Sequence, residues 1–201
     1  MRDRPDAPAT RRNRDAILSV LRDEFRDRSE VLEIGSGTGQ HAVFFGSLMP
    51  HLRWQTSDLP ENHAGIRAWL SESAIGNVLP PVELDVLGTK QLERDFDAAF
   101  SANTAHIMGF PAVTAMFRLI GSALCDGGVF CLYGPFRLGG AFTSSSNEEF
   151  DRSLRQQNPD MGIRDLADIV DLAGANGMVL SRRYAMPANN MLLVFLRPGQ
   201  A

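Results

Sequence analysis

The chain has 201 residues, 44% of them hydrophobic and 22% charged, which is enough for one folded domain and too few for two of ordinary size. Its net charge is -4, and acidic residues interrupt the one dense basic stretch, so no nucleic-acid partner is expected. No run of 18 or more apolar residues is present, which argues against a membrane-spanning helix and a membrane partner.

The two cysteines, Cys125 and Cys131, are too few for a disulfide framework and lack the spacing of a zinc site. Both lie among apolar residues, so we expect buried, reduced thiols and no bound metal. The N-terminus has no apolar signal-peptide core. Together these features favour a cytoplasmic protein.

The predicted elements alternate between helices and short apolar strands. Residues 1–10 are expected to form an arm. Helices are predicted over residues 14–28, 39–49, 60–70, 91–94, 111–124, 146–157 and 166–175. Strands are predicted over residues 31–34, 52–57, 82–86, 97–102, 129–133, 178–185 and 191–196. A capping-box pattern, Ser146-x-x-Glu149, marks the expected start of the helix over 146–157.

This alternation is typical of a parallel sheet with helices on both faces. The last two strands are joined by four residues, Pro187-Ala-Asn-Asn190, which are too few for a crossover, so this pair must be antiparallel. We therefore predict a doubly wound, Rossmann-like α/β fold with a seven-stranded, mostly parallel sheet and an antiparallel C-terminal hairpin strand. Residues 1–201 are treated as a single domain with an N-terminal arm over 1–12 and a substrate-covering loop and helix over 134–165.

The stretch Gly35-Ser-Gly-Thr-Gly39 follows the first predicted strand directly. It is not a P-loop, because it lacks the Gly-Lys-Ser/Thr ending. It also departs from the dinucleotide fingerprint, since Gln40 stands where the third glycine is expected. Alternate glycines leave one wall of the turn free of Cβ atoms, so a flat group without phosphate can lie there. A tight turn without a ligand is the alternative interpretation.

Acidic residues follow the second and third predicted strands. Asp58 is placed to accept both hydroxyls of a ribose, or else to cap the helix that begins at Pro60. Asp85, between Leu84 and Val86, suits an adenine. The acid accepts a hydrogen bond from the adenine amine, and Leu84 and Val86 pack against the ring. An exposed acid at a strand end is the alternative for Asp85. Because ligands bind at the carboxyl ends of parallel strands, these residues are expected to share one site.

Polar and aromatic residues follow the fourth and fifth predicted strands. Asn103 and His106 are expected near the reacting group, and a purely structural role for His106 is equally compatible with the pattern. A Gly- and Ser-rich loop begins after Tyr133, and its Phe136 and Phe142 are expected to exclude water from a site. An ordinary surface connection is the alternative.

The pattern Glu33-x-Gly35-x-Gly37-x-Gly39, the two acids and the final antiparallel strand resemble the class I S-adenosylmethionine (SAM)-dependent methyltransferases over nearly the whole chain. Two further stretches are similar to a small methyltransferase-like family of unknown function. The first is Arg12-Asn13 with the helix that follows it. The second runs from Tyr133-Gly-Pro-Phe136 through Ser146-Asn147 to Gly162-Ile-Arg-Asp165.

The resemblance implies SAM as the cofactor and S-adenosylhomocysteine (SAH) as the product. It places the glycines along the methionine part of SAM, Glu33 beneath the ammonium, and Asn103 near the methionine moiety. It places Asp58 on the ribose and Asp85 on the adenine. The implied cofactor residues are Arg12, Asn13, Glu33, Gly35, Ser36, Gly37, Thr38, Gly39, Asp58, Leu84, Asp85, Val86 and Asn103.

For the reaction we expect methyl transfer to a small-molecule nucleophile that is held in line with the methyl group and away from water. A base is needed only if the acceptor arrives protonated, and the candidates are His106, Tyr133 and Asp151. The acceptor pocket is assigned to His106, Tyr133, Phe136, Phe142, Ser146 and Asn147. Three alternatives stay open: a SAM enzyme of another reaction type, such as cyclisation or aminocarboxypropyl transfer; a non-catalytic SAM-binding subunit; and a nicotinamide oxidoreductase.

Overall fold

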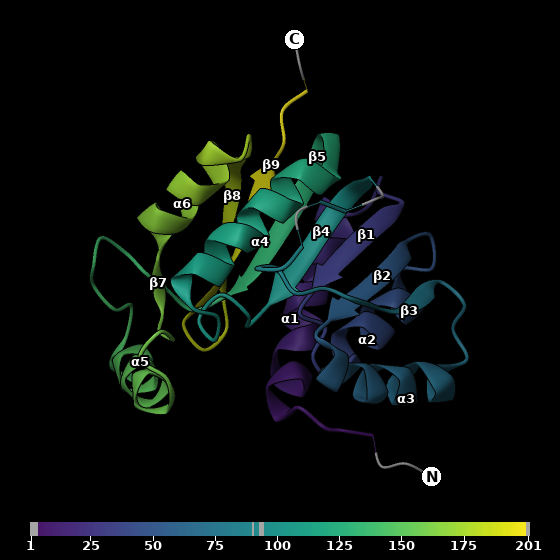
Figure 1. The fold of residues 1–201 in the computed structure, drawn as a ribbon, viewed down its shortest axis with the longest axis horizontal. Coiled ribbons are helices and arrows are strands. Elements are labelled where there is room, and N and C mark those ends of the chain that lie inside the picture. Colours follow the sequence, from purple (N-terminus) through teal and green to yellow (C-terminus); the bar gives the residue numbers. More distant parts are fainter. Residues whose placement is uncertain (1–3, 90, 93–94, 200–201) are drawn as a thin grey trace.

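The computed structural model describes residues 4–89, 91–92 and 95–199. The strands of its main sheet are β1 (Glu30–Ile34), β2 (Arg53–Asp58), β3 (Val78–Glu83), β4 (Phe96–Ala102), β5 (Leu124–Gly134), β8 (Val179–Met186) and β9 (Asn190–Leu196). They are ordered β3-β2-β1-β4-β5-β9-β8 (Figure 1). The first five are paired in parallel, and β9 is antiparallel to both of its neighbours. The predicted fold is confirmed.

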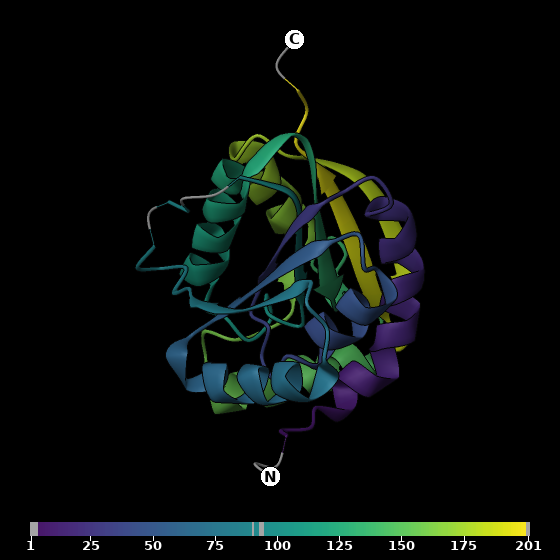
Figure 2. The ribbon, with the colours of Figure 1, turned by 90° about the vertical axis from the view of Figure 1, so that its right-hand side faces the viewer.

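Helices cover both faces of this sheet. One face carries α1 (Pro8–Glu24), α2 (Gln40–Leu48) and α3 (His63–Ser73), which follows the short 3-10 turn η1 (Pro60–Asn62). The other face carries α4 (Phe110–Ala123) and α6 (Leu166–Ala175), as Figure 2 shows from the side. The described helices include none that is both long enough and apolar enough to cross a bilayer.

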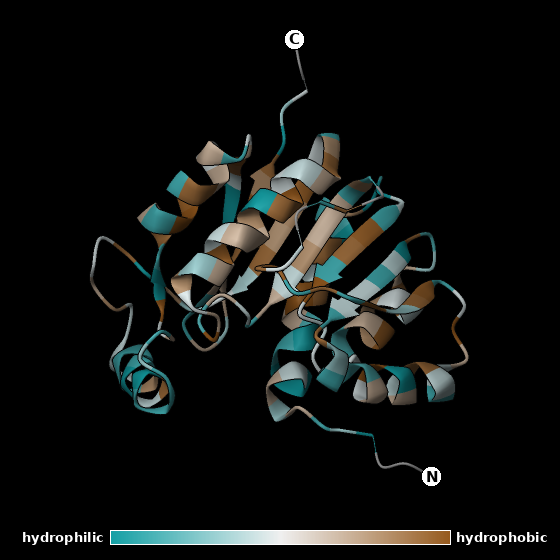
Figure 3. Ribbon diagram, in the orientation of Figure 1, coloured by the Kyte–Doolittle hydropathy of each residue, from teal (hydrophilic) through white to brown (hydrophobic). Residues whose placement is uncertain are grey.

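The sheet separates two apolar cores because successive strand residues point to opposite faces. Phe130 and Leu132 of β5 pack with α4 and α6, whereas Val129, Cys131 and Tyr133 of the same strand pack on the side of α1 and α2. The central strands are therefore apolar on both faces, and Figure 3 shows brown and tan stretches along them, whereas α5 is largely teal.

A separate small unit projects from the carboxyl edge of the sheet (Figure 1). It contains α5 (Ser145–Gln157) and two short parallel strands, β6 (Phe136–Arg137) and β7 (Arg164–Asp165). The side chain of Ser144, not the predicted Ser146, caps α5 by accepting a hydrogen bond from the Asn147 N–H at 3.2 Å. The capping-box prediction was thus two residues late, because several serines precede this helix.

Several boundaries differ from the predictions. Helix α1 begins at Pro8, so residues 8–12 are helical instead of part of an arm; proline is well tolerated in a first turn. Strand β3 spans Val78–Glu83, so it begins before the predicted strand over 82–86 and ends before residues 84–86 of it. Its two prolines are tolerated because it is an edge strand. Of the helix predicted over 91–94, residues 93 and 94 lie outside the described residues, and residues 91–92 are not helical.

The two cysteines differ in burial. Cys131 is buried as predicted, and burial raises the pKa of its thiol. Cys125 is exposed, contrary to the prediction, because it lies where the pairing of β4 with β5 shifts register, between the partners of Phe96 and Ala98.

Candidate functional site

A cavity of about 560 Å³ lies at the carboxyl ends of β1, β2, β3 and β4. Its wall includes the turn 35–38 after β1, Asp58 at the end of β2, residues 84–87 after β3 and Asn103 after β4. Ala7, Ala9 and Thr10 from the N-terminal segment also line it. This is the position at which ligands bind in open α/β sheets.

The three glycines of the turn all have positive φ values: +73° at Gly35, +57° at Gly37 and +86° at Gly39. A Cβ at Gly35 would lie 2.5 Å from Thr104 Cγ2, and one at Gly39 would lie 2.9 Å from Ile66 Cα. A Cβ at Gly37 would meet no protein atom within 4 Å. Gly35 and Gly37 both line the cavity, but only at Gly37 does the absence of a side chain leave open space. Gly35 and Gly39 instead permit close packing of the protein on itself.

Asp58 is a buried acceptor at the edge of the cavity. Its Oδ2 accepts a hydrogen bond from the Gly37 N–H at 2.6 Å. Its Oδ1 accepts from the Leu59 N–H at 2.8 Å and from Asn62 Nδ2 at 2.7 Å. Because a carboxylate has about four acceptor sites, these three bonds orient the group and leave capacity for a ligand hydroxyl.

The segment after β3 combines an acid with apolar side chains. Leu84 and Val86 are buried and line the cavity together with Ile107. Asp85 is exposed, and its Oδ1 accepts the Leu87 N–H at 2.9 Å in a tight turn. An apolar slot with one carboxylate at its rim suits a flat heterocycle that carries an amine.

Glu33 lies beneath the turn and does not line the cavity. It is 2% exposed, and its Oε2 accepts hydrogen bonds from Ser36 Oγ at 2.8 Å and Trp54 Nε1 at 3.1 Å. Burial raises the pKa of this carboxyl from 4.5 to about 7; the two hydrogen bonds oppose the rise and the charge of Asp58 adds to it.

The two predicted residues of α1, Arg12 and Asn13, do not line the cavity. Arg12 is exposed and does not line the cavity. Asn13 is buried, and its Oδ1 accepts a hydrogen bond from His41 Nε2 at 2.8 Å, since a carboxamide oxygen only accepts. His41 does line the cavity, and burial, reinforced by the charge of Arg14, lowers its pKa to about 3. The sequence prediction missed His41, Thr10 and Asn62, which carry no recognisable motif.

The three candidate bases do not line this cavity. His106 is buried with its ring against Phe150, and burial followed by the charge of Arg164 lowers its pKa to about 4. Tyr133 is buried, and burial raises its pKa while the nearby Asn13 side chain lowers it. Asp151 forms an ion pair with Arg155 at 2.7 Å. Their catalytic assignment stays a prediction.

The residues predicted to bind the acceptor do not line this cavity. Phe136 is 1% exposed in the apolar core, and Phe142 is partly buried beneath the guanidinium of Arg137, with 5.9 Å between them. Ser146 is exposed on α5. Asn147 is buried, and its Nδ2 donates to Thr143 Oγ1 and to the backbone carbonyl of Asn189. The structure thus brings nine of the thirteen predicted cofactor residues to one cavity, leaves out Arg12, Asn13, Glu33 and Gly39, and brings none of the predicted acceptor residues to it.

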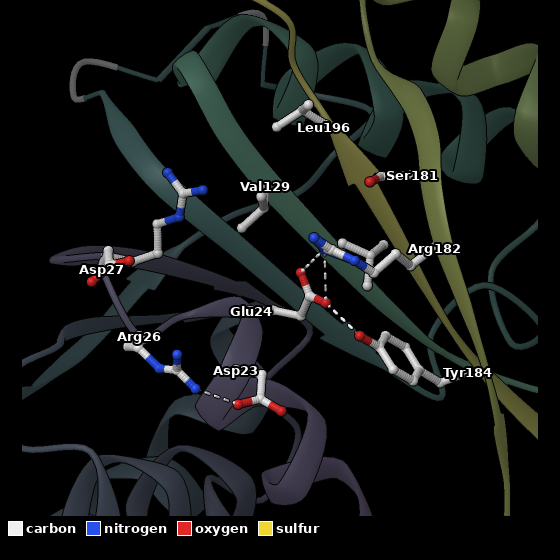
Figure 4. A pocket seen from close by; sticks show the side chains of 11 residues that line it. Asp23, Glu24, Arg26, Asp27, Val129, Ser181, Arg182, Tyr184 and Leu196 are labelled. Atoms are coloured by element: carbon white, nitrogen blue, oxygen red, sulfur yellow. Dashed lines mark hydrogen bonds and ion pairs between the residues drawn. The ribbon is translucent and has the colours of Figure 1, made fainter.

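A second cavity, of about 420 Å³, lies between the end of α1 and strands β5, β8 and β9 (Figure 4). Glu24 there accepts hydrogen bonds from Arg182 Nη1 at 3.1 and 3.2 Å and from the Tyr184 hydroxyl at 2.7 Å. The bond to Glu24 raises the pKa of Tyr184 to about 12. Arg26 pairs with Asp23 at 2.7 Å. These groups satisfy one another's hydrogen-bonding capacity, so we assign no ligand to this cavity.

Among the described residues, no three or more His, Cys, Asp or Glu side chains lie together in a way that could hold a metal ion.

The sheet order, the single antiparallel strand and the helices on both faces define the Rossmann-like fold of class I SAM-dependent methyltransferases. A family model described as "Protein of unknown function (DUF938)" matches residues 4–197, and the chain belongs to this family.

Solved methyltransferase structures share the fold. The SAM-dependent methyltransferase SibL in its apo form matches with a TM-score of 0.80 and 19% identity, covering 94% of this chain and 56% of that one. An O-methyltransferase family protein from Burkholderia thailandensis matches with a TM-score of 0.80 and 14% identity, over 93% and 57% of the two chains. PigF with SAH matches with a TM-score of 0.75 and 18% identity, over 89% and 53%. The chain therefore spans little more than half the length of these proteins.

Proposed function

We propose that the protein is a SAM-dependent methyltransferase that methylates a small-molecule nucleophile. One observation carries the proposal: a glycine turn without a phosphate-binding lysine, the buried acceptor Asp58 and the apolar slot beside Asp85 converge on one cavity. A nucleoside without phosphate calls for these three features. The shared fold supports the proposal, since one matched structure was solved with SAH.

Each part of the cavity fits one part of SAM. Asp58 accepts a ribose hydroxyl through the capacity that its three protein hydrogen bonds leave free. Leu84 and Val86 pack against the adenine, and Asp85 accepts a hydrogen bond from its amine. The open side of Gly37 leaves room for the methionine part. When bound, SAM supplies an activated methyl group on its sulfonium.

The acceptor side determines which nucleophiles are candidates. The chain must hold the acceptor in line and exclude water, and it needs a base only for a protonated acceptor. His106 has a pKa near 4 and is a weak base at neutral pH, so an acceptor that loses its own proton readily is favoured. Small hydroxyl compounds are the first to test, because one matched structure belongs to an O-methyltransferase family protein.

Binding of SAM and SAH by isothermal calorimetry tests the proposal. The wild-type protein should bind both at one site. Asp58→Ala should weaken SAH binding by about 10-fold or more, because it removes a buried charged acceptor. Asp171→Ala, which changes an exposed aspartate of α6, is the matched control and should bind like the wild type. Absence of binding of both compounds to the folded wild-type protein would refute the proposal.

The reaction type is tested separately, by mass spectrometry of the cofactor-derived product after incubation with SAM and a panel of small hydroxyl compounds. SAH together with a methylated compound supports methyl transfer. Methylthioadenosine indicates the alternative, a SAM enzyme of another reaction type. Binding without turnover, together with a tightly associated partner protein, indicates a non-catalytic subunit.

A cytoplasmic location is part of the proposal. It is supported by Cys125 and Cys131, which are free thiols in the structure. Fractionation of cells that express the full chain tests it, and recovery in a membrane or secreted fraction would contradict it.

A further inference from the structure

The residue that breaks the dinucleotide fingerprint, Gln40, binds the N-terminal segment. Gln40 is 5% exposed at the first position of α2. Its Oε1 accepts hydrogen bonds from the Ala7 N–H at 2.6 Å and from Thr38 Oγ1 at 3.0 Å. Its Nε2 donates to Asp6 Oδ1 at 3.0 Å. One buried amide thus joins the glycine turn to residues 33 and 34 positions earlier in the chain.

The same N-terminal segment, residues 4–7, is also held by α3, and we name it the strap. Trp69 Nε1 donates to the Pro5 carbonyl at 2.9 Å. The Arg4 guanidinium lies 4.2 Å from the centre of the Trp69 ring and pairs with Glu72 at 3.0 Å. A Cβ on Gly65 would come within 2.8 Å of Pro5 Cγ, so the absence of a side chain at Gly65 makes room for the strap.

The strap and the start of α1 contribute to the wall of the cavity. Ala7 of the strap and Ala9 and Thr10 of α1 line it together with the turn 35–38. A ligand that fills the cavity therefore contacts the segment that Gln40 holds. Because Ala7 is both a lining residue and a partner of Gln40, breaking these hydrogen bonds releases part of the wall.

We propose that Gln40 determines how long the site retains its nucleoside ligand, because its hydrogen bonds to the strap, which we call the clasp, fix part of the cavity wall and must open before the ligand can exchange. The inference rests on the proposed function for the identity of that ligand. It gives Gln40 a positioning role, exerted through the strap and not through contact with the reacting atoms.

The test uses the full chain and SAH as the probe. The dissociation rate of SAH is measured by stopped-flow tryptophan fluorescence, and Trp69→Phe establishes whether the strap-facing indole reports it. Gln40→Ala should dissociate SAH about 10-fold faster than the wild type, since it removes three partly buried hydrogen bonds. Asp6→Ala, which acts from the exposed strap and leaves α2 intact, should give a smaller increase. Gln157→Ala on the surface of α5 is the matched control and should match the wild type.

Hydrogen exchange of the Ala7 amide in the ligand-free protein provides an independent readout. The amide should be protected in the wild type and in Gln157→Ala and unprotected in Gln40→Ala. If Gln40→Ala and Asp6→Ala both dissociate SAH at rates within about 2-fold of the wild type, the retention role is wrong. An unprotected Ala7 amide in the wild type would overturn the clasp. If the wild type binds no SAH, the proposed function fails and the retention role with it, while the exchange result still judges the clasp.

Discussion

Replacing Glu33 with glutamine tests the protonation state of the carboxyl group beneath the glycine turn. Burial raises the pKa of Glu33 from 4.5 to about 7, although Trp54 and Ser36 donate hydrogen bonds to it. Between these two pH values the folded protein holds a proton that the unfolded chain has lost. The free energy of unfolding therefore falls as the pH rises from 4.5 to 7, and it stays lowered above pH 7.

The size of this effect follows from the shift. One pKa unit corresponds to about 1.4 kcal/mol, so ionising the buried group costs about 3 kcal/mol once the pH is above 7. Glutamine cannot ionise, and its carbonyl oxygen still accepts from Trp54 and Ser36. The stability of Glu33→Gln relative to wild type should therefore improve by about 2–3 kcal/mol between pH 5 and pH 8.

Urea unfolding of both proteins at four pH values between 5 and 8 measures this difference. Glu149→Gln makes the same chemical change on the exposed surface of α5 and serves as the control, which should follow the wild type throughout. If Glu33→Gln also follows the wild type at every pH, the carboxyl is ionised in the folded protein at neutral pH and the reasoning is wrong.

Three further predictions test other parts of the structure. Ser144→Ala should lower the free energy of unfolding by about 1 kcal/mol through loss of the α5 cap, whereas Ser146→Ala should change it by less than about 0.5 kcal/mol in urea; the reverse order would contradict the observed cap. Gly37→Ala should weaken SAH binding by about 10-fold with a modest loss of stability. Gly39→Ala should mainly lower the free energy of unfolding, because its Cβ would meet the α3 backbone. Calorimetry measures the first effect and urea unfolding the second, and equal effects of the two substitutions would exclude distinct roles for the two glycines. His106, whose pKa is near 4, should show no imidazole titration by NMR between pH 7.5 and 5. The free energy of unfolding should fall as the pH drops from 6.5 towards 4, because the unfolded chain binds a proton that the folded protein does not. His106→Gln should reduce this loss.

The sequence could predict which residues meet at the cavity where those residues lie at the ends of strands. Asp58 closes β2, and Asn103 follows β4, so the parallel sheet itself brings them to one edge. Even the misplaced boundary of β3 did little harm, since Leu84 and Val86 still line the cavity just past the end of that strand.

The residues predicted to act as a base or to bind the acceptor could not be located in the same way, because tertiary contacts position them. Asp151 accepts the Ile163 N–H at 2.7 Å, and Asn147 donates to the Asn189 carbonyl 42 residues away. No periodicity or motif reports such contacts. The burial of Phe136 has the same origin: an aromatic residue in a Gly-rich loop suggests a pocket, but the short pairing of β6 with β7 turns it into the core.

The late position of β9 in the chain has a consequence for biosynthesis. Residues 129–133 of β5 pair on one side with β4, and residues 129–134 pair on the other side with β9, which spans Asn190–Leu196. Until β9 has left the ribosome, a strongly apolar strand in the middle of the sheet has one unpaired edge. Such edges recruit other chains, so the nascent protein is vulnerable to aggregation until β9 is available to pair. A chaperone that shields this edge, or slow synthesis at low temperature, should raise the yield of folded protein.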